Sequence, residues 1–443
     1  MPGRMFIALS AILSGAALSG SVWGDSDRYR VIVIPAPEGA SYANATAMNG
    51  SNEVTGSALI GSMVKPFLYS DGECVWLDQI PGVSTSGHGI NDGGHVAGWM
   101  YTWGVIWPEA FLWDGAAHQP LGTLNGDYSY GEGLNNHDEV VGWWTGGSAA
   151  ANGHAFVHTG GRMIDLGPGI AFDISETGVV VGSEDRGFSD AALWEPGPNG
   201  WTRTVLEGRE ILSVNSSGTI AAGTGPSGGY FDRASMWTLK DSNWVRTDLG
   251  DWDPLLTHSM ATGVNDAGQI VGTFEELGEA TKAFLFEDGE VSWLTDRLAP
   301  DFAANWTVTR ALAINESGHI LAEAKEGLAE RSVILVPDRL SVLSPRPGVA
   351  GERNELIATG ATPDAVVYFV YGLTTGSTPL PNCPGVIVDI AAPKIAGSAR
   401  ANKTGEARMR AFVPVAAAGA TVYLQAVEPA SCAVSRRIHS TIR

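Results

Sequence analysis

The sequence has few basic residues. It contains 27 Lys and Arg against 48 Asp and Glu, which gives a formal net charge of −21 at pH 7. Proteins that bind nucleic acids or anionic membrane surfaces need the opposite balance, because their partners carry dense negative charge. The composition therefore disfavours both classes of partner and predicts an acidic protein with other ligands.

The chain also lacks long hydrophobic runs after its first residues. No segment beyond the N-terminus approaches the ~18 uninterrupted apolar residues that a transmembrane helix requires. Residues 1–24 have the features of a signal peptide: Arg4 in the positive region, an apolar stretch from Met5 to Leu18, and Val22 and Gly24 before the expected cleavage point. We expect a secreted protein, extracellular or at the cell surface, with no membrane insertion and a mature chain that begins near Asp25.

Motifs for cofactors and metals are absent or occur in the wrong context. Residues 223–229 fit both G-x-G-x-x-G and G-x-S-x-G, but they join two expected strands, whereas these motifs require a following helix. His154 and His158 lie four residues apart on an expected strand, about 13 Å from one another, too far to share a metal ion. The Asn-Asp and Asn-Glu pairs resemble calcium ligands, but an Asn that opens a turn normally caps its own backbone. We predict no cofactor, no metal site and no catalytic residue.

The chain does contain seven copies of one repeat. Each copy has two short apolar runs around a tight turn, and two more around a second turn that is Asp-Gly in several copies, which is the pattern of two β-hairpins. The period is about 44 residues, typical of the four strands of a β-propeller blade. The residue that opens the first turn is Asn49, Asn91, Asn135, Ser175, Asn215, Asn265 or Asn315.

Two features predict that the repeats close into a ring. The seventh copy has only three strands, the third at Arg331 to Val336, and an additional apolar strand at Tyr29 to Pro35 would complete it. In addition, the residues two and four positions before the turn Asn are mostly small, as the crowded centre of a ring requires. Asp173 and Ile211 are the exceptions. The sequence thus predicts an all-β fold with a seven-bladed β-propeller whose N-terminal strand closes the last blade.

The unit Gly-Val-Asn-Asp-Ala-Gly-Gln-Ile-Val-Gly of residues 263–272, followed by Ala-Phe-Leu-Phe of 283–286, resembles the HAF-type extracellular repeat of secreted bacterial proteins. The resemblance covers roughly residues 40 to 337. It implies an extracellular location and a repeat architecture, and it implies no particular reaction.

A different module follows the repeats, so we expect three regions: the signal peptide 1–24, the propeller 25–338 and a C-terminal module 339–443. Short alternating strands separated by turn signals predict a small Ig-like β-sandwich. The segment Val-Tyr-Phe-Val-Tyr-Gly of 367–372 is similar to a C-terminal module of secreted bacterial proteins, which implies a surface or accessory role. The expected strands are 354–358, 366–371, 386–390, 394–400, 407–413 and 421–427.

Cysteine is scarce, with three residues in the chain. Cys383 and Cys432 both lie in the C-terminal module, and in an exported protein they most simply form a disulfide. Cys74 remains, and we expect it to be a buried free thiol.

The best functional signal lies in the connections between the second and third strands of the repeats, and in connections between repeats such as 127–130 and 252–256. They emerge on one face of a propeller, where loops often carry function. Aromatic rings beside acidic groups suit stacking on sugar rings and hydrogen bonding to hydroxyls, although packing between blades could equally require them. The candidate binding residues are Trp99, Tyr101, Trp103, Trp107, Trp143, Trp144, Asp185, Tyr230, Phe231 and Glu275.

These observations favour a monomeric, non-enzymatic recognition module for a glycan or an extracellular protein. One alternative is a propeller-type glycoside hydrolase or polysaccharide lyase, which needs two carboxylates about 5 to 9.5 Å apart in the central channel. The other alternative is a purely structural cell-surface component. The acids that could supply the hydrolase pair are Asp173, Glu184, Asp185, Glu275 and Glu276.

Overall fold

The computed structural model of the protein describes residues 28–77, 84–101, 107–124, 126–146, 153–185, 190–226, 232–250, 257–381, 383 and 386–443. The expected signal peptide lies outside these residues. In the described part, helix is limited to α1 (Pro300–Ala303) and the 3-10 turns η2 (Leu294–Arg297) and η3 (Val415–Ala417). None of these helices is long and apolar enough to cross a bilayer.

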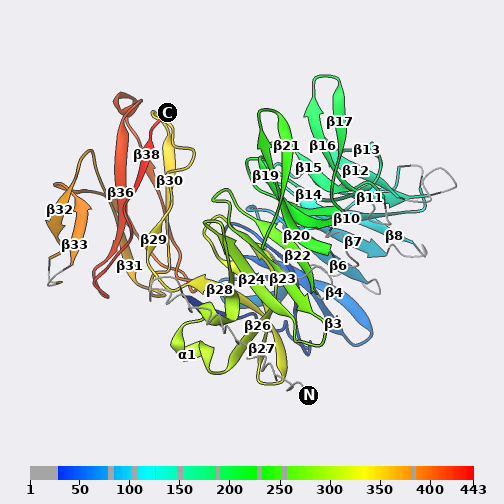
Figure 1. Cartoon of the computed structure of the whole chain (residues 1–443), viewed down its shortest axis with the longest axis horizontal. Helices are drawn as coiled ribbons and strands as arrows, with labels where there is room; N and C mark the ends of the chain where they lie inside the picture. Colours follow the sequence, from blue (N-terminus) through cyan, green and yellow to red (C-terminus); the bar gives the residue numbers. More distant parts are fainter. Residues whose placement is uncertain are drawn as a thin grey trace, which may run out of the picture.

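Most described strands form four-stranded antiparallel sheets in which the strands pair in chain order (Figure 1). The order follows from two consecutive hairpins in each repeat. The first to third sheets are β2 (Asn44–Met48), β3 (Val54–Ile60), β4 (Met63–Ser70), β5 (Glu73–Trp76); β6 (Thr85–Ile90), β7 (Val96–Tyr101), β8 (Pro108–Trp113), β9 (His118–Gly122); and β10 (Tyr128–Leu134), β11 (Val140–Thr145), β12 (His154–Thr159), β13 (Arg162–Pro168). The fourth to sixth are β14 (Ile170–Ile174), β15 (Val180–Ser183), β16 (Ala191–Gly197), β17 (Gly200–Leu206); β18 (Glu210–Val214), β19 (Ile220–Pro226), β20 (Asp232–Lys240), β21 (Asn243–Asp248); and β22 (Thr257–Val264), β23 (Ile270–Glu276), β24 (Lys282–Glu287), β25 (Glu290–Trp293).

The seventh sheet combines both ends of the repeat region. Its order is β1-β28-β27-β26, with β1 (Tyr29–Val33), β26 (Trp306–Ile314), β27 (Ile320–Glu326) and β28 (Ala329–Pro337). The register of β1 on β28 runs from Tyr29 opposite Pro337 to Val33 opposite Val333. The predicted completion of the last repeat by the N-terminal strand is therefore confirmed.

Hydrogen bonds between the first turns join each sheet to the next. The Oδ1 atom of each turn Asn caps its own turn, as expected; Asn49, for example, accepts from the backbone N–H groups of Ser51 and Glu53, both at 2.9 Å. The Nδ2 group of the same side chain donates to the following sheet, which the sequence analysis did not anticipate. Five of these bonds end on a turn carbonyl, and they run from Asn49 to Asn91 (2.8 Å), Asn91 to Asn135 (3.1 Å), Asn135 to Ser175 (3.2 Å), Asn265 to Asn315 (3.1 Å) and Asn315 to Asn49 (3.2 Å).

The two remaining junctions use other groups. The fourth repeat has Ser175 in place of Asn, and there Asp173 accepts a 2.9 Å hydrogen bond from the Val214 N–H of the fifth sheet. Asn215 donates to the Asp266 carboxylate of the sixth sheet at 2.7 Å. The seven sheets are thus connected in a closed cycle, and the large residue at position 173, an exception in the sequence pattern, replaces the missing amide bridge.

The small residues before each turn allow the first strands to approach one another. A β-carbon at Gly133 would lie 2.8 Å from the carbonyl oxygen of Phe172, and one at Gly263 would lie 3.0 Å from the Cα of Ala313. These distances are too short for any larger side chain. The crowding that the sequence pattern predicted is therefore confirmed at both places.

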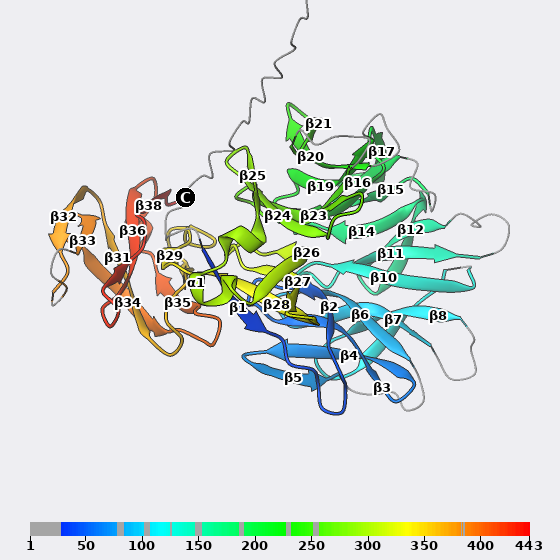
Figure 2. The same cartoon turned by 60° about the horizontal axis from the view of Figure 1, so that its bottom comes forward.

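Between the two small positions, every first strand has a β-bulge, visible as a register shift against its partner strand. A bulge adds one residue and redirects its side chain. All seven bulge residues line a single cavity of about 360 Å³ on the axis of the ring, and they are Thr46, His88, Glu132, Phe172, Leu212, Thr262 and Leu312. Sheets arranged radially around an axial channel form a β-propeller. Figure 2 shows the sheets of the repeats following one another from the blue part of the chain through cyan to green.

The C-terminal module contains two antiparallel sheets and a separate hairpin, drawn yellow to red beside the propeller in Figure 1. Leu356, Val367, Phe369 and Leu424 belong to its buried core. One sheet is β29 (Ser341–Val342), β30 (Arg353–Thr359) and β35 (Ala407–Phe412); the other is β34 (Lys394–Arg400), β31 (Val366–Gly372), β36 (Thr421–Glu428) and β37 (Ala433–Val434), with β38 (Ile438–Thr441) on β36; the hairpin is β32 (Thr375–Pro379) and β33 (Ile387–Ile390).

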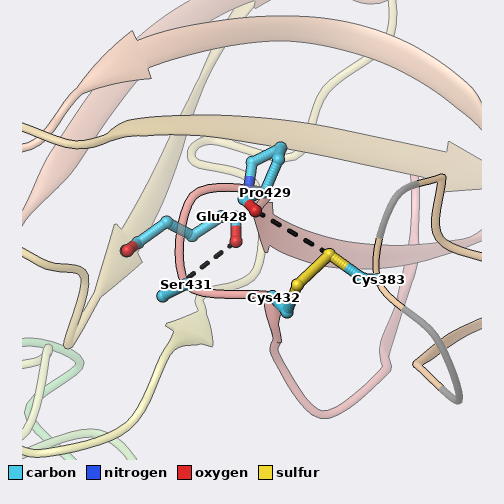
Figure 3. The surroundings of a disulfide bond; sticks show 5 residues. All are labelled: Cys383, Glu428, Pro429, Ser431 and Cys432. Carbon is cyan, nitrogen blue, oxygen red and sulfur yellow. Dashed lines mark hydrogen bonds between the residues drawn. A yellow bond between two sulfur atoms is a disulfide. The ribbon is translucent and has the colours of Figure 1, made fainter.

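The expected disulfide and the expected free thiol are both present, but the free thiol is less buried than predicted. Cys383 and Cys432 form a disulfide that ties residue 383 to the turn between β36 and β37 (Figure 3). Cys74, on β5, is a free thiol. It is partly buried, and burial raises its pKa to about 12, so it stays protonated and unreactive at neutral pH.

The module contacts the turn side of the propeller where the ring closes. Asn52 of the first sheet donates to Thr404 (3.1 Å) and Glu406 (3.2 Å), and Arg408 donates to the carbonyl oxygen of Gly50. Arg346, in the connection between the two parts, lies 3.5 Å from Glu316 of the seventh sheet and lines the axial channel. The module therefore covers the junction between the first and last sheets.

The turn asparagines make a testable contribution to stability. Asn265→Ala removes the cap of its own turn and leaves the Asn315 carbonyl unpaired, so we expect a loss of about 2–4 kcal/mol in the free energy of unfolding. Asn265→Ser, which copies the natural Ser175, keeps a turn acceptor and should cost about half as much. Urea unfolding of the full chain measures both. Equal stability of wild type and Asn265→Ala would contradict the role of this bond.

His319 predicts a pH dependence at the junction between propeller and module. Its side chain is completely buried; burial, with the charges of Arg30 and Arg408, lowers its pKa from 6.5 to about 3. Between pH 6.5 and 3, His319 is protonated in the unfolded chain but neutral in the folded protein. Its contribution to the free energy of unfolding is therefore fully present above pH 6.5 and decreases as the pH falls towards 3. We expect a loss of about 1–2 kcal/mol between pH 7 and 5.5.

His319→Leu should remove this component, so the stability difference between wild type and variant should change with pH over the same range. Thermal unfolding followed by circular dichroism at pH 7, 6 and 5.5 measures it. A constant difference between the two proteins at all three pH values would refute the assignment.

Candidate functional site

The bulge residues that line the axial channel differ in polarity. The first, second, third and sixth sheets supply the polar residues Thr46, His88, Glu132 and Thr262, whereas the fourth, fifth and seventh sheets supply Phe172, Leu212 and Leu312. His88 and Glu132 come from neighbouring sheets, so the second and third sheets bring two titratable side chains together at the channel wall.

Glu132 connects this wall to the adjacent aromatic residues. One of its carboxylate oxygens lies 2.7 Å from His88 Nδ1, and the other accepts a 3.2 Å hydrogen bond from the Trp143 indole N–H. Burial alone would lower the pKa of His88, but the hydrogen bond and the charge of Glu132 raise it above its ordinary value. The two sheets thus hold a hydrogen-bonded His–Glu pair at the channel wall.

Six aromatic side chains of the second and third sheets form one continuous group, here called the aromatic cluster. It consists of Trp99, Tyr101, Trp107, Tyr128, Tyr130 and Trp143. Two ring pairs are stacked, Trp107 on Tyr128 with centroids 5.6 Å apart and Tyr130 on Trp143 at 4.5 Å. Edge-to-face contacts at 5.6–5.9 Å complete the group, joining Trp99 to Tyr101, Trp99 to Tyr130, Tyr128 to Tyr130 and Tyr128 to Trp143.

The cluster lies on the face of the propeller opposite the C-terminal module. β7 runs from the Asn91 turn to Tyr101, and β10 runs from Tyr128 back to the Asn135 turn, so the aromatic residues are at the strand ends remote from the turns. The module contacts the turn side. Trp107 is 47% exposed and Tyr101 37% exposed, whereas Trp143 is 9% exposed. The cluster therefore extends from a solvent-exposed rim to the partly buried carboxylate of Glu132.

Comparison with models of known protein families and with curated proteins found no match, so the resemblance to HAF-type repeats stays a prediction. Solved structures show a distant likeness. A structure from a study of two prolyl endopeptidases matches at TM-score 0.47 and 11% identity over 75% of this chain and 53% of that chain. Prolyl oligopeptidase B from Galerina marginata matches at TM-score 0.41 and 13% identity, over 77% and 57% of the two chains.

The β-propeller domain of the Trilobed protease from Pyrococcus furiosus matches at TM-score 0.35 and 9% identity, over 73% of this chain and 92% of that domain. The present chain thus spans only a little more than half the length of the prolyl peptidases it matches. Likeness at this level says nothing about a reaction, so the site must be interpreted from its own residues.

The sequence-predicted residues are divided among several places. Trp99, Tyr101, Trp107 and Trp143 come together in the aromatic cluster. Trp144, next to Trp143, points to the other side of β11 and is buried in the core between the second and third sheets, with His154 against its ring at 5.1 Å. Asp185 follows β15 in the fourth sheet, and the exposed Glu275 lies on β23 in the sixth. Trp103, Tyr230 and Phe231 lie outside the described residues.

The acids proposed for a hydrolase are not gathered in the channel. Asp173 lines the channel, but its two oxygens accept backbone N–H bonds from Ile174 and Val214. Asp173 is partly exposed, but protein atoms surround most of its carboxylate. This burial raises the pKa of Asp173 to about 6, although the two hydrogen bonds act in the opposite direction. Glu184 pairs with Arg203 of β17 at 2.8 Å, outside the channel lining.

Besides Glu132 and Asp173, three other acids line the channel, and each is bound to a neighbouring turn. Asp92 accepts from the N–H of Gly50, Glu176 from that of Asn136, and Glu316 from that of Asp266. These carboxylates hold the sheets together. Among the described residues, no group of three or more His, Cys, Asp or Glu side chains has the arrangement of a metal site.

Sequence reasoning placed the connection 127–130 on the functional face but missed His88 and Glu132. The available signal was their position: each stands between the two small residues that precede the turn, where a bulge directs the side chain into the channel. His88 and His95 stand on either side of the same turn, but they do not pair with each other. Instead His88 bonds to Glu132 and His95 to Asp138, both in the third sheet.

The His–Glu pair predicts a measurable titration. In Glu132→Gln the charge is lost while the burial of His88 remains, so the pKa of His88 should fall from above to below its ordinary value. Nuclear magnetic resonance of protein labelled with ¹⁵N-histidine follows this titration, with His137, which is mostly exposed, as an internal reference. An unchanged pKa of His88 would show that Glu132 does not control it.

Proposed function

We propose that the protein is a secreted, non-enzymatic recognition module that binds a glycan on the aromatic cluster. In this proposal the repeats form a seven-bladed propeller of the HAF type, and residues 339–443 form an Ig-like sandwich that supports it from the opposite face. The observation that carries the proposal is the aromatic cluster itself, with two partly exposed rings at its rim and the Glu132 carboxylate at its inner end.

A sugar ring offers an apolar face of C–H groups and a margin of hydroxyls. Trp107, stacked on Tyr128, presents an aromatic face held by a second ring, so little side-chain entropy is lost when a sugar packs against it. Glu132 and His88 offer an acceptor and a titratable donor at the channel wall. This combination of stacking surface and hydrogen-bonding groups supports a neutral carbohydrate better than an anionic polymer, since the chain is strongly acidic.

An extracellular protein partner and a structural role are the competing interpretations. The structural role is weaker, because a cluster that served only to pack the second sheet on the third would have no reason to keep Trp107 and Tyr101 exposed. A protein partner would also use exposed aromatic rings, and the glycan array decides between these two ligands. The hydrolase or lyase alternative has less support still. Of its five proposed acids, Asp173 is the one that lines the channel, and its oxygens are used between sheets.

Trp107→Ala tests the proposal with little risk to the fold, because the side chain is half exposed. We expect binding to the best ligand on a glycan array to weaken roughly tenfold, about 1.4 kcal/mol, through loss of stacking. The melting temperature should change by no more than about 2 °C. Trp143→Ala is a poorer test, since Trp143 is buried and supports Tyr130.

Tyr42→Ala is the matched control, because Tyr42 is 55% exposed and lies before β2, outside the aromatic cluster. It should leave binding unchanged. Failure of the wild-type protein to bind any glycan on the array, or an equal loss in Trp107→Ala and Tyr42→Ala, would contradict the proposal.

A further inference from the structure

A second cavity lies between the N-terminal strand of the propeller and the C-terminal module, far from the aromatic cluster. Its volume is about 440 Å³, within the range of small-molecule sites. Arg30 of β1, the connection at Asp338 and Arg339, and Thr362, Glu428 and Arg436 of the module line it. Both parts of the protein therefore contribute to its wall.

Glu428 is the unusual group in this cavity. The residue is 1% exposed, and one carboxylate oxygen, Oε2, accepts a 2.8 Å hydrogen bond from the Thr362 N–H. Within the described part of the chain, the other oxygen, Oε1, is buried and has no hydrogen-bond partner. A buried carboxylate oxygen without a donor is costly, so Oε1 is the group of this wall that an added donor would stabilise most.

The charged residues that line the cavity are mainly basic. Three arginines, Arg30, Arg339 and Arg436, stand against the two carboxylates of Asp338 and Glu428. The Arg30 side chain is engaged with Asp338 at 3.0 Å. In a chain of net charge −21 this is a locally basic site, and guanidinium groups favour a carboxylate ligand.

The wall that carries Glu428 is fixed in place. Glu428 is the last residue of β36, and the turn after it contains Cys432, whose disulfide to Cys383 restrains it (Figure 3). Ser431 Oγ donates to the Glu428 carbonyl oxygen at 3.5 Å within the same turn. A preorganised wall loses little conformational entropy on binding, which favours affinity for a small ligand.

We propose that this cavity binds a small carboxylate that also carries a hydrogen-bond donor. The donor pairs with Glu428 Oε1, and the carboxylate lies on the arginine side. Two sources share this chemistry: a uronic acid, whose donor is a hydroxyl, and an α-amino acid, whose donor is an ammonium group. The site is independent of the aromatic cluster and would stand if glycan binding there failed.

Isothermal titration of the full chain with D-glucuronate, L-alanine and D-glucose tests the proposal. At least one of the two carboxylates should bind at concentrations below about 10 mM, and D-glucose, which lacks the carboxylate, should bind at least tenfold more weakly than the better one. Binding of D-glucuronate identifies the uronic acid source and binding of L-alanine the amino acid source. Absence of binding by both, or equal binding of glucose and glucuronate, would overturn the proposal.

Two substitutions locate the ligand. Arg436→Ala changes an exposed residue, so the fold should be preserved, and it should weaken carboxylate binding about tenfold. Glu428→Gln keeps an acceptor for the Thr362 N–H but replaces the second oxygen by a donor, and should weaken binding by a similar factor. Arg437→Ala is the matched control, because Arg437 donates to the Asp389 carbonyl oxygen outside the cavity. If Arg436→Ala and Arg437→Ala weakened carboxylate binding equally, the effect would come from the overall charge of the protein, and the site would be rejected.

Discussion

The constraint on which the structure depends is that a single four-stranded sheet cannot cover its own two faces. Each repeat supplies about 35 residues of strand and turn, too few for an independent core. Neighbouring sheets therefore share their apolar clusters, as Leu134 and Val140 of the third sheet do with Ala97 and Leu112 of the second. The turn asparagines fix the order of the contacts between sheets, because one side-chain amide both caps its own turn and donates to the turn of the next sheet. The last of these bonds runs from Asn315 back to Asn49 and closes the cycle.

This crowding at the axis also creates the functional geometry. Small residues let the first strands of neighbouring sheets approach one another. The bulge in each first strand directs one side chain per sheet into the channel. Each first strand has its turn at one face of the propeller and its other end at the opposite face. The turn face is occupied by the C-terminal module at the junction between the first and last sheets. The opposite face remains for the aromatic cluster. The His–Glu pair between the second and third sheets joins the channel to that face.

Much of the fold could be predicted because its signals are local. Turn chemistry at Asn49 or Asp288-Gly289 and a constant period define the hairpins, and six of the expected strands of the C-terminal module, including 366–371 and 421–427, are present. The strand Thr375–Pro379 is not among the expected strands, and it pairs in a small hairpin with β33. What the sequence could not show is contact between sheets. Trp143 and Trp144 look alike in the sequence, yet the pleat sends one to the cluster and the other to the core, and the bridge from Asp173 to Val214 depends on two separate repeats.

Closure of the ring by the N-terminal strand is the central claim, since it defines both faces. Hydrogen–deuterium exchange of the full chain measures it directly. If β1 completes the seventh sheet, those amides of residues 29–33 whose N–H groups face β28 should be as strongly protected as the amides of β28, because they open only when the ring opens. Rapid exchange of every amide of residues 29–33 while β27 and β28 remain protected would contradict closure, and with it the assignment of the two faces.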